Sequence, residues 1–328
     1  MARIFTEGFE MGDNLGFGGS GTIYSNPHRS GNYSTSRGQY AHNVDDLSEV
    51  YVRLGWYPRD GYESSSYDTY IRFRNGTTTL AHIRLNASNG IDAYVKNVKV
   101  ADGGALSIAV DTWWLVEIHF KLDDANGVIQ TKINGVLDID YSGDTKPDAS
   151  TVFDNIYFNQ SSLAYSQYLD DIAINDTTGS EDNSWCGDGH IVYIKPNADG
   201  DNIGLTGSDE NQTDNYAMVD DIPSDGDTTY VYGDTVDDYD LYELTAPSLP
   251  TNHTIIRIWA EARAKDPDTG DIALMIKAGT TEDDSDDTTL TTAYSAIKGE
   301  EYLLNPDDSE AWEAADLNDL QVGVKIRS

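Results

Sequence analysis

The sequence predicts an all-β protein of two β-sandwich or jelly-roll domains in tandem, with one short helix near the C-terminus. Three observations predict this class. Apolar and polar residues alternate in most segments, and a period of two places neighbouring side chains on opposite faces of a strand. Apolar patterns of helical period are nearly absent before residue 300. Tyrosine is abundant, with 21 residues against 7 phenylalanines, and its side chain suits the half-exposed face of a sheet.

In the first half, turn residues bound each alternating segment, so each segment is a predicted strand. These segments are 51–59, 70–75, 81–86, 93–100, 113–123, 128–141 and 153–160. Within the sixth, Asn134 and Gly135 separate two alternating runs, which is the strongest short-range signal for a hairpin. Many short strands with regular turns are typical of a sandwich or jelly roll. We therefore expect a first sandwich or jelly-roll domain over 1–178.

The second half begins after a polar, Gly- and Ser-rich stretch, 179–189, which we expect to be a linker. Residues 190–328 then predict a second, acidic β-sandwich. Its predicted strands are 190–196, 229–233, 240–244, 254–265, 271–279 and 321–327. Segment 309–320 is rich in alanine and acids and predicts the short helix. Segment 281–289 carries adjacent like charges and is expected to be a mobile hairpin tip or loop.

The formal net charge of -36 at pH 7 limits the partners of the chain. Such a surface repels nucleic acid and anionic membranes, so neither is expected as a partner. No stretch has the apolar length of a membrane span, so we expect no membrane insertion. The charge is explained by solubility; the alternative is that carboxylate clusters bind Ca²⁺ or Na⁺.

Cysteine usage and the start of the chain bear on the compartment. The single cysteine, Cys186, excludes an intramolecular disulfide and argues against a Cys-based metal site. The opening residues "MARIFTEGFEMGDN" show no basic segment followed by an apolar one. We therefore expect synthesis in a cytoplasm, with exit as cargo or by lysis.

Tests for catalytic motifs predict a protein that is not an enzyme. "GFGGSG" (16–21) matches the dinucleotide fingerprint in letters, but loops flank it instead of a strand and a helix, so we expect a flexible turn. The six histidines have no metal-binding spacing, and no G-x-S-x-G motif occurs. "EIHF" (117–120) resembles the strand acids of sandwich glycosidases only faintly, because the second acid nearby is missing.

One acidic segment is a candidate additional metal site. "NADGDN" (197–202) places oxygens on Asn197, Asp199 and Asp201 at positions one, three and five of an EF-hand-like loop. It lacks the glycine at position six and the glutamate at position twelve that such a loop requires. The alternative is a turn with solvated carboxylates.

The two ends of the first domain resemble those of LamG-type, concanavalin A-like jelly rolls. The residues that carry the resemblance are "IFTEGFEMGD" (4–13) and "YLDDIAIND" (168–176). In many such modules a carboxylate from each end shares a structural Ca²⁺, so the resemblance implies Glu10 and Asp171 as ligands. Physically, adjacent carboxylates on a strand that enters a core need a cation or hydrogen bonds. The alternative is that Asp170 points outward and Asp171 accepts backbone N–H bonds without a metal.

The second half is similar to a module that recurs in structural proteins of tailed bacteriophages, often after a LamG-like jelly roll. The segments that carry this likeness are 215–233, 257–279 and 311–327. It implies a non-enzymatic virion protein on the particle exterior, as capsid decoration or tail component, assembled in the host cytoplasm. Its partners would be other virion proteins, with the chain a homo-oligomer or bound to a lattice. The chain has no coiled-coil or collagen-like stalk, which argues against a long tail fibre.

An adhesive role would use aromatic side chains. Trp56, Tyr57, Tyr62 and Tyr67 are candidates for a platform that stacks on host-surface glycan. The alternative is that they pack in the core and at its rim. Two other function classes stay open: a carbohydrate-binding or adhesin module of a bacterium, and a polysaccharide hydrolase or lyase on the same scaffold, because fold does not fix function.

Overall fold

The computed structural model describes residues 3–59, 69–85, 90–104, 108–160, 167–245, 249 and 252–328. The chain forms two compact units, Met1–Val192 and Tyr193–Ser328. In the described residues every regular element is a strand, apart from two short 3₁₀ turns. This confirms the all-β class with tandem domains. The same residues include no helix that is long and apolar enough to span a membrane.

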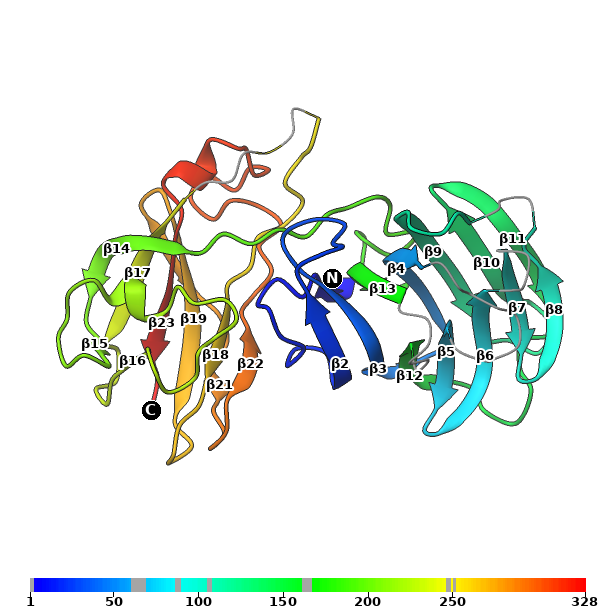
Figure 1. Ribbon diagram of the computed structural model, residues 1–328, viewed down its shortest axis with the longest axis horizontal. Coiled ribbons are helices and arrows are strands. Elements are labelled where there is room, and N and C mark those ends of the chain that lie inside the picture. Colours follow the sequence, from blue (N-terminus) through cyan, green and yellow to red (C-terminus); the bar gives the residue numbers. More distant parts are fainter. Residues whose placement is uncertain are drawn as a thin grey trace. The chain divides into compact units, whose positions relative to one another are not determined.

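Within its described residues, the first unit contains thirteen antiparallel strands. They are β1 (Arg3–Glu7), β2 (Gly19–Tyr24), β3 (Ser34–Leu47), β4 (Glu49–Pro58), β5 (Thr69–Asn75), β6 (Thr78–Leu85), β7 (Ile91–Val95), β8 (Val98–Asp102), β9 (Trp114–Lys121), β10 (Gly127–Ile133), β11 (Val136–Gly143), β12 (Phe153–Gln160) and β13 (Gln167–Asn175). Their order is β11-β10-β9-β4-β13-β3-β12-β5-β6-β7-β8, with β1 on β13 and β2 on β3. Because β13 and β3 pair at only two positions, the order divides there into two sheets (Figure 1).

The inward faces of these two sheets form one apolar core. Phe73 of β5 stacks on Phe120 of β9 with ring centres 4.3 Å apart, and Phe153 of β12 packs on both. Burial alternates along β10 from Gly127 to Ile133, as expected for a strand with one face on a core. The unit is therefore a sandwich whose alternate side chains point away from the core to the surface.

The predicted hairpin is confirmed, whereas segment 93–100 differs from expectation. Asn134 and Gly135 connect β10 to β11, both with positive φ, as a two-residue hairpin turn requires. Segment 93–100 was predicted as one strand, but Lys96, with φ 51°, turns the chain between β7 and β8. In the sequence, only the adjacent polar residues Lys96 and Asn97 between Val95 and Val98 mark this turn.

The expectation that "GFGGSG" is a flexible turn is wrong, because β2 begins at Gly19 and pairs with β3. A Cβ atom at Gly21 would lie 1.4 Å from the hydroxyl oxygen of Tyr40. The glycine therefore allows β2 to pass close to a buried tyrosine. This close approach accounts for that glycine without a bound nucleotide.

In the part of the second unit that the structure describes, there are ten strands and the two 3₁₀ turns. They are β14 (Pro196–Ile203), β15 (Thr206–Gly207), η1 (Asn215–Met218), β16 (Val231–Tyr232), β17 (Tyr239–Leu244), β18 (Glu261–Ala264), β19 (Asp271–Ala278), β20 (Thr281–Asp284), β21 (Thr288–Thr289), β22 (Ser295–Lys298), η2 (Asp316–Asn318) and β23 (Gln321–Ile326). The main sheet has the order β14-β17-β23-β19-β20, with β21 also on β19. Two further ladders join β15 to β16 and β18 to β22.

Four expectations for this unit are corrected by the structure. Of segment 254–265, which was expected to be one strand, only Glu261–Ala264 forms a strand, β18. Segment 190–196 is irregular up to its last residue, where β14 begins. Of the helix expected over 309–320, only the 3₁₀ turn η2 forms. Before it, Trp312 is buried in the core and its indole N–H donates to the carbonyl of Tyr302, so the chain there is not helical.

The acidic segment 281–289 is not a mobile tip but forms β20 and β21 on β19. The side chain of Asp284 is paired with Lys325 at 3.2 Å and Arg327 at 2.7 Å. Basic side chains from the end of β23 thus compensate part of the acidic charge that predicted a loop.

Candidate functional site

Asp170 and Asp171 interrupt β13 with a bulge. Asp170 pairs with Gly55 and Ala173 with Arg53, so three residue steps on β13 face two steps on β4. Asp171 has φ 50°, in the left-handed region that residues other than glycine seldom adopt. Both aspartate side chains are fully buried. The alternative that Asp170 points outward is therefore wrong, because the extra residue breaks the alternation.

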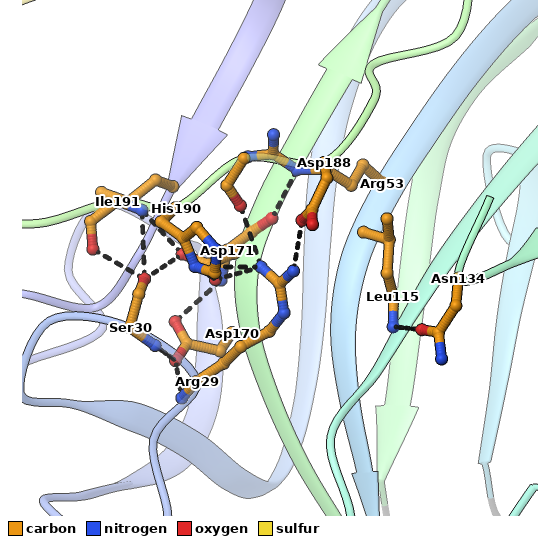
Figure 2. A network of polar contacts seen from close by, with 11 residues as sticks. Arg29, Ser30, Arg53, Leu115, Asn134, Asp170, Asp171, Asp188, His190 and Ile191 are labelled. Atoms are coloured by element: carbon orange, nitrogen blue, oxygen red, sulfur yellow. Dashed lines mark hydrogen bonds and ion pairs between the residues drawn. The ribbon is translucent and has the colours of Figure 1, made fainter. Parts of the chain in front are cut away.

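The carboxylate of Asp171 is saturated by donors from the chain (Figure 2). Arg29 Nη1 donates to Oδ2 at 2.6 Å, while Ser30 Oγ at 2.5 Å and the N–H of Ile191 at 2.8 Å donate to Oδ1. The ring nitrogen Nδ1 of His190 lies 3.6 Å from Oδ2. Asp171 therefore forms a buried ion pair with Arg29, supported by hydrogen bonds.

Asp170 and Glu10 hold the loop that precedes β3. The N–H groups of Arg29 and Ser30 donate to Asp170 Oδ2 at 2.7 and 3.3 Å. Those of Asn32 and Tyr33 donate to the two oxygens of Glu10, at 2.8 and 3.1 Å. Gly31, between Ser30 and Asn32, has φ 57°, and a Cβ atom there would lie 2.1 Å from the carboxyl carbon of Glu10. The two carboxylates thus bind successive N–H pairs of one tight loop.

Burial makes two of these three carboxyl groups hard to ionise. It raises the pKa of Glu10 to about 8, against the lowering effect of its two N–H bonds. Burial, and then the charge of Asp171, raise the pKa of Asp170 well above its ordinary value. Burial also opposes ionisation of Asp171, but the His190 bond and the charge of Arg29 hold its pKa below the usual range. Without a cation, Glu10 and Asp170 therefore favour the neutral, protonated form, and Asp171 carries the negative charge of the cluster.

Whether a cation fits this cluster depends on the oxygen ligands that its three carboxyl groups can offer. In the described ranges no three His, Cys, Asp or Glu side chains are arranged to hold a metal. Carboxylate oxygens are suitable ligands for Ca²⁺, and a bound cation would favour the ionised forms of Glu10 and Asp170. Asp171 is already neutralised by Arg29. The calcium site at Glu10 and Asp171 stays a prediction, in which Arg29 already supplies a counter-charge to Asp171.

Part of the expected linker, 179–189, lies against the first unit. The N–H of Gly187 donates to Glu117 Oε1 at 2.8 Å. Arg29 donates to the carbonyl of Gly189 at 2.9 Å and forms an ion pair with Asp188 (Figure 2). The same arginine that neutralises the bulge therefore also fixes the chain as it leaves the first unit.

The second candidate metal site lies on β14 instead of in a loop. Asp199 accepts two N–H bonds from the start of η1, at 2.7 and 3.1 Å. Asp201 forms an ion pair with Lys277, and Asn197 is exposed. The carboxylates of Asp199 and Asp201 are thus each engaged by groups of the second unit.

The candidate stacking residues are divided between the core and its rim. Trp56 is 2% exposed and belongs to the core. Tyr57 is half-buried and packs on Trp113, with ring centres 5.3 Å apart. Tyr62 and Tyr67 lie outside the described residues.

A surface that the sequence reasoning missed lies on the outer side of β12, β5, β6, β7 and β8. We call it the basic face, and define it by Arg72, Arg74, His82, Arg84, Tyr94, Lys99, Asn155 and Tyr157. Tyr157, Arg72, His82 and Tyr94 are successive cross-strand partners and form one row. Their sequence neighbours are core residues, so alternation places this row on the side away from the core.

Aromatic rings hold the basic groups of this face in place. The guanidinium carbon of Arg74 lies 3.6 Å from the ring centre of Tyr157, and that of Arg84 lies 4.2 Å from the ring centre of Tyr94. His82 stacks on Tyr94 with ring centres 4.7 Å apart and planes 4° from parallel. The cations are therefore preorganised by stacking.

Crowding of positive groups shows in their pKa values. Burial, and then the charges of Arg84 and Arg72, lower the pKa of His82 to about 4. Burial, and then the charge of Arg72, lower the pKa of Arg74. His82 is thus neutral at pH 7, and the arginines carry the charge of this face. The sequence signal is basic residues at alternate positions of "YIRFRN" and "AHIRLN", on the side opposite the apolar residues.

Comparison with known proteins gives no family for the chain. No family model matches it, and no curated protein matches it. Similar solved structures include a cellulose induced protein, at 16% identity over 56% of this chain and 100% of its own, with a TM-score of 0.44. An alginate lyase from Chlorella virus is 11% identical over 53% of this chain and 99% of its own, TM-score 0.36.

A third similar structure is a carbohydrate esterase from the Shiga toxin-encoding bacteriophage phi24B. It is 11% identical over 48% of this chain and 88% of its own, with a TM-score of 0.36. At these identities and scores, the likenesses assign neither an activity nor a ligand to this chain.

Proposed function

We propose that the protein is a non-enzymatic component of the exterior of a tailed-phage virion, and that its first unit binds glycan of the host surface. One observation supports the glycan-binding part. The basic face joins arginine donors, tyrosines and an asparagine on the outer side of a sheet. Charged and amide groups fixed on a rigid scaffold are suited to binding the polar groups of a sugar chain.

The virion part of the proposal is supported by the resemblance of the second half to a module of tailed-phage structural proteins that often follows a LamG-like jelly roll. The net charge of -36 is compatible with an exterior position, because like-charged particles repel one another and resist aggregation. In this role the chain would bind other virion proteins as a homo-oligomer or on a lattice. A bacterial adhesin would use the same face with a different attachment.

A lyase is the second candidate, because His82 and Tyr94 lie in contact on this face beside Arg84. Cleavage of an acidic sugar chain by elimination needs a base and a cation that stabilises the developing charge. The protein is incubated with acidic polysaccharides while the ultraviolet absorbance of the unsaturated product is followed. For a non-enzymatic protein we expect no increase in absorbance. A steady increase that His82→Gln abolishes would show that the protein is a lyase.

The glycan-binding part is tested on an array of neutral and acidic glycans with the labelled full chain. We expect retention on a subset of glycans and loss of retention in Arg74→Gln. Absence of binding to every glycan on the array would contradict this part of the proposal.

A further inference from the structure

We propose that the basic face binds an acidic polysaccharide, with uronic acid carboxylates bound by Arg72, Arg74 and Arg84. This inference rests on the proposed function and adds to it the chemical class of the ligand. Its basis is the arrangement of the three arginines on two adjacent strands, β5 and β6. Strand geometry sets neighbouring positions about 5 Å apart across strands and about 7 Å apart along one strand.

The occupation of the tyrosine rings favours recognition of charge over stacking. Tyr157 has the guanidinium groups of Arg74 and Arg72 at 3.6 and 5.7 Å from its ring centre. Tyr94 carries Arg84 and also the ring of His82. These aromatic faces are engaged with basic groups of the chain. The arginines stacked on these rings offer a ligand a set of oriented N–H donors, which match planar carboxylates.

The charge balance of the face points to the same class. Lys99 contacts both carboxylates near the arginines, Asp92 at 3.5 Å and Asp102 in a closer ion pair. The guanidinium group of Arg74 packs on the ring of Tyr157 and lies beside the positive charge of Arg72. An anion placed here would relieve the repulsion between the arginines.

Two unsatisfied polar atoms give the ligand a second feature. Arg74 Nε and Asn155 Oδ1 are buried, and neither has a hydrogen-bond partner among the described residues. The two residues are cross-strand partners, and Asn155 is only 8% exposed. A buried donor and acceptor without partners are costly, so a group that satisfies both is stabilising. A uronic acid supplies an acceptor in its carboxylate and a donor in its hydroxyl groups.

The strongly acidic chain does not prevent this binding at physiological salt. Charges farther away than about 8 Å are largely screened there, whereas contacts inside the face are screened much less. Local contacts with the arginines therefore decide the affinity. Because they are ionic, added salt is expected to weaken binding.

Calorimetry on the full chain tests the inference with polygalacturonate, dextran sulfate and neutral dextran as probes. We expect binding of polygalacturonate, weakened roughly tenfold or more in Arg74→Gln, because one charge-assisted contact is lost. The control is Arg59→Gln, the same chemical change at a side chain that is 51% exposed and lies outside the basic face. Its affinity should equal that of the unchanged protein.

The other outcomes separate this inference from the proposed function. Equal binding of dextran would overturn the acidic class but leave glycan binding intact. Binding of dextran sulfate alone would overturn the carboxylate assignment. Failure of all three probes and of the glycan array would overturn both proposals. If circular dichroism shows that Arg74→Gln does not fold, the salt titration of the unchanged protein decides, because polygalacturonate affinity that is independent of salt contradicts ionic recognition.

Discussion

At the scale of single residues, Asp171 holds the buried charge of the bulge. Its carboxylate is the partner of Arg29, which is itself nearly buried. We expect Asp171→Asn to destabilise the first unit by about 3–5 kcal/mol, because the arginine is left without a full counter-charge. Urea unfolding measures the change. The control, Asp124→Asn at an exposed position, should stay within about 0.5 kcal/mol; an equal effect of both would contradict the account.

His82 makes stability depend on pH in a direction that its environment sets. Its pKa is about 4 in the folded state, against an ordinary value near 6.5. Between these values the unfolded chain binds more protons, so the free energy of unfolding falls as pH falls, by at most about 1.4 kcal/mol per unit. We expect His82→Gln to lose this part of the dependence in urea unfolding at a series of pH values. Identical profiles for both proteins would exclude the effect.

The residues of the bulge show how far sequence reasoning reaches at this scale. Adjacent acids on a strand that enters a core predicted that Asp170 and Asp171 need compensation. The sequence did not identify Arg29 as the partner, because 142 positions separate it from Asp171. It also left an outward Asp170 open as an alternative, because a bulge with a left-handed residue leaves no mark in the alternation.

At the scale of elements, the β10–β11 hairpin depends on a glycine. Gly135 has φ 77°, and nothing lies within 4 Å of the Cβ that alanine would add. Gly135→Ala should therefore cost about 1–2 kcal/mol from backbone conformation alone. Gly104→Ala is the control, because its surroundings are equally open and its φ is not left-handed. Thermal unfolding compares them, and an equal loss at Gly104 would refute the conformational explanation.

An element could be predicted from the sequence where the residues that determine it are close together in the chain. Asn134 and Gly135 specify their turn within two residues, so the hairpin could be predicted. The strands in segment 281–289 could not, since residues distant in sequence compensate their charge. The basic charges of Lys325 and Arg327, which pair with Asp284, are one example.

At the scale of the whole molecule, the calcium prediction concerns the stability of the folded chain. If Ca²⁺ binds at Glu10, Ca²⁺ at a hundred times its dissociation constant should raise the free energy of unfolding by about 2.7 kcal/mol. The unfolding temperature in excess Ca²⁺ should therefore be higher than in chelator. Glu10→Gln should abolish the difference, because it removes one ligand charge. Differential scanning calorimetry measures both proteins, and equal unfolding temperatures with Ca²⁺ and with chelator would argue against the site.

The basic face also belongs to this scale, because it exists only when five strands are assembled side by side. Arg72 and Tyr157 are 85 positions apart but are cross-strand partners. Alternation in single segments indicated which residues point outward, and only the strand order brought them together. This is why the sequence suggested stacking on Trp56, which the structure places in the core.

The most direct measurement of the proposed function is the location of the protein on purified phage particles, by mass spectrometry and cryo-electron microscopy. The account predicts the chain in stoichiometric amounts, with density for two β-sandwich units on the outside of the capsid or tail and the basic face exposed to solvent. Absence of the chain from purified particles would contradict the virion assignment. Density that covers the basic face with another virion protein would contradict its role in binding host glycan.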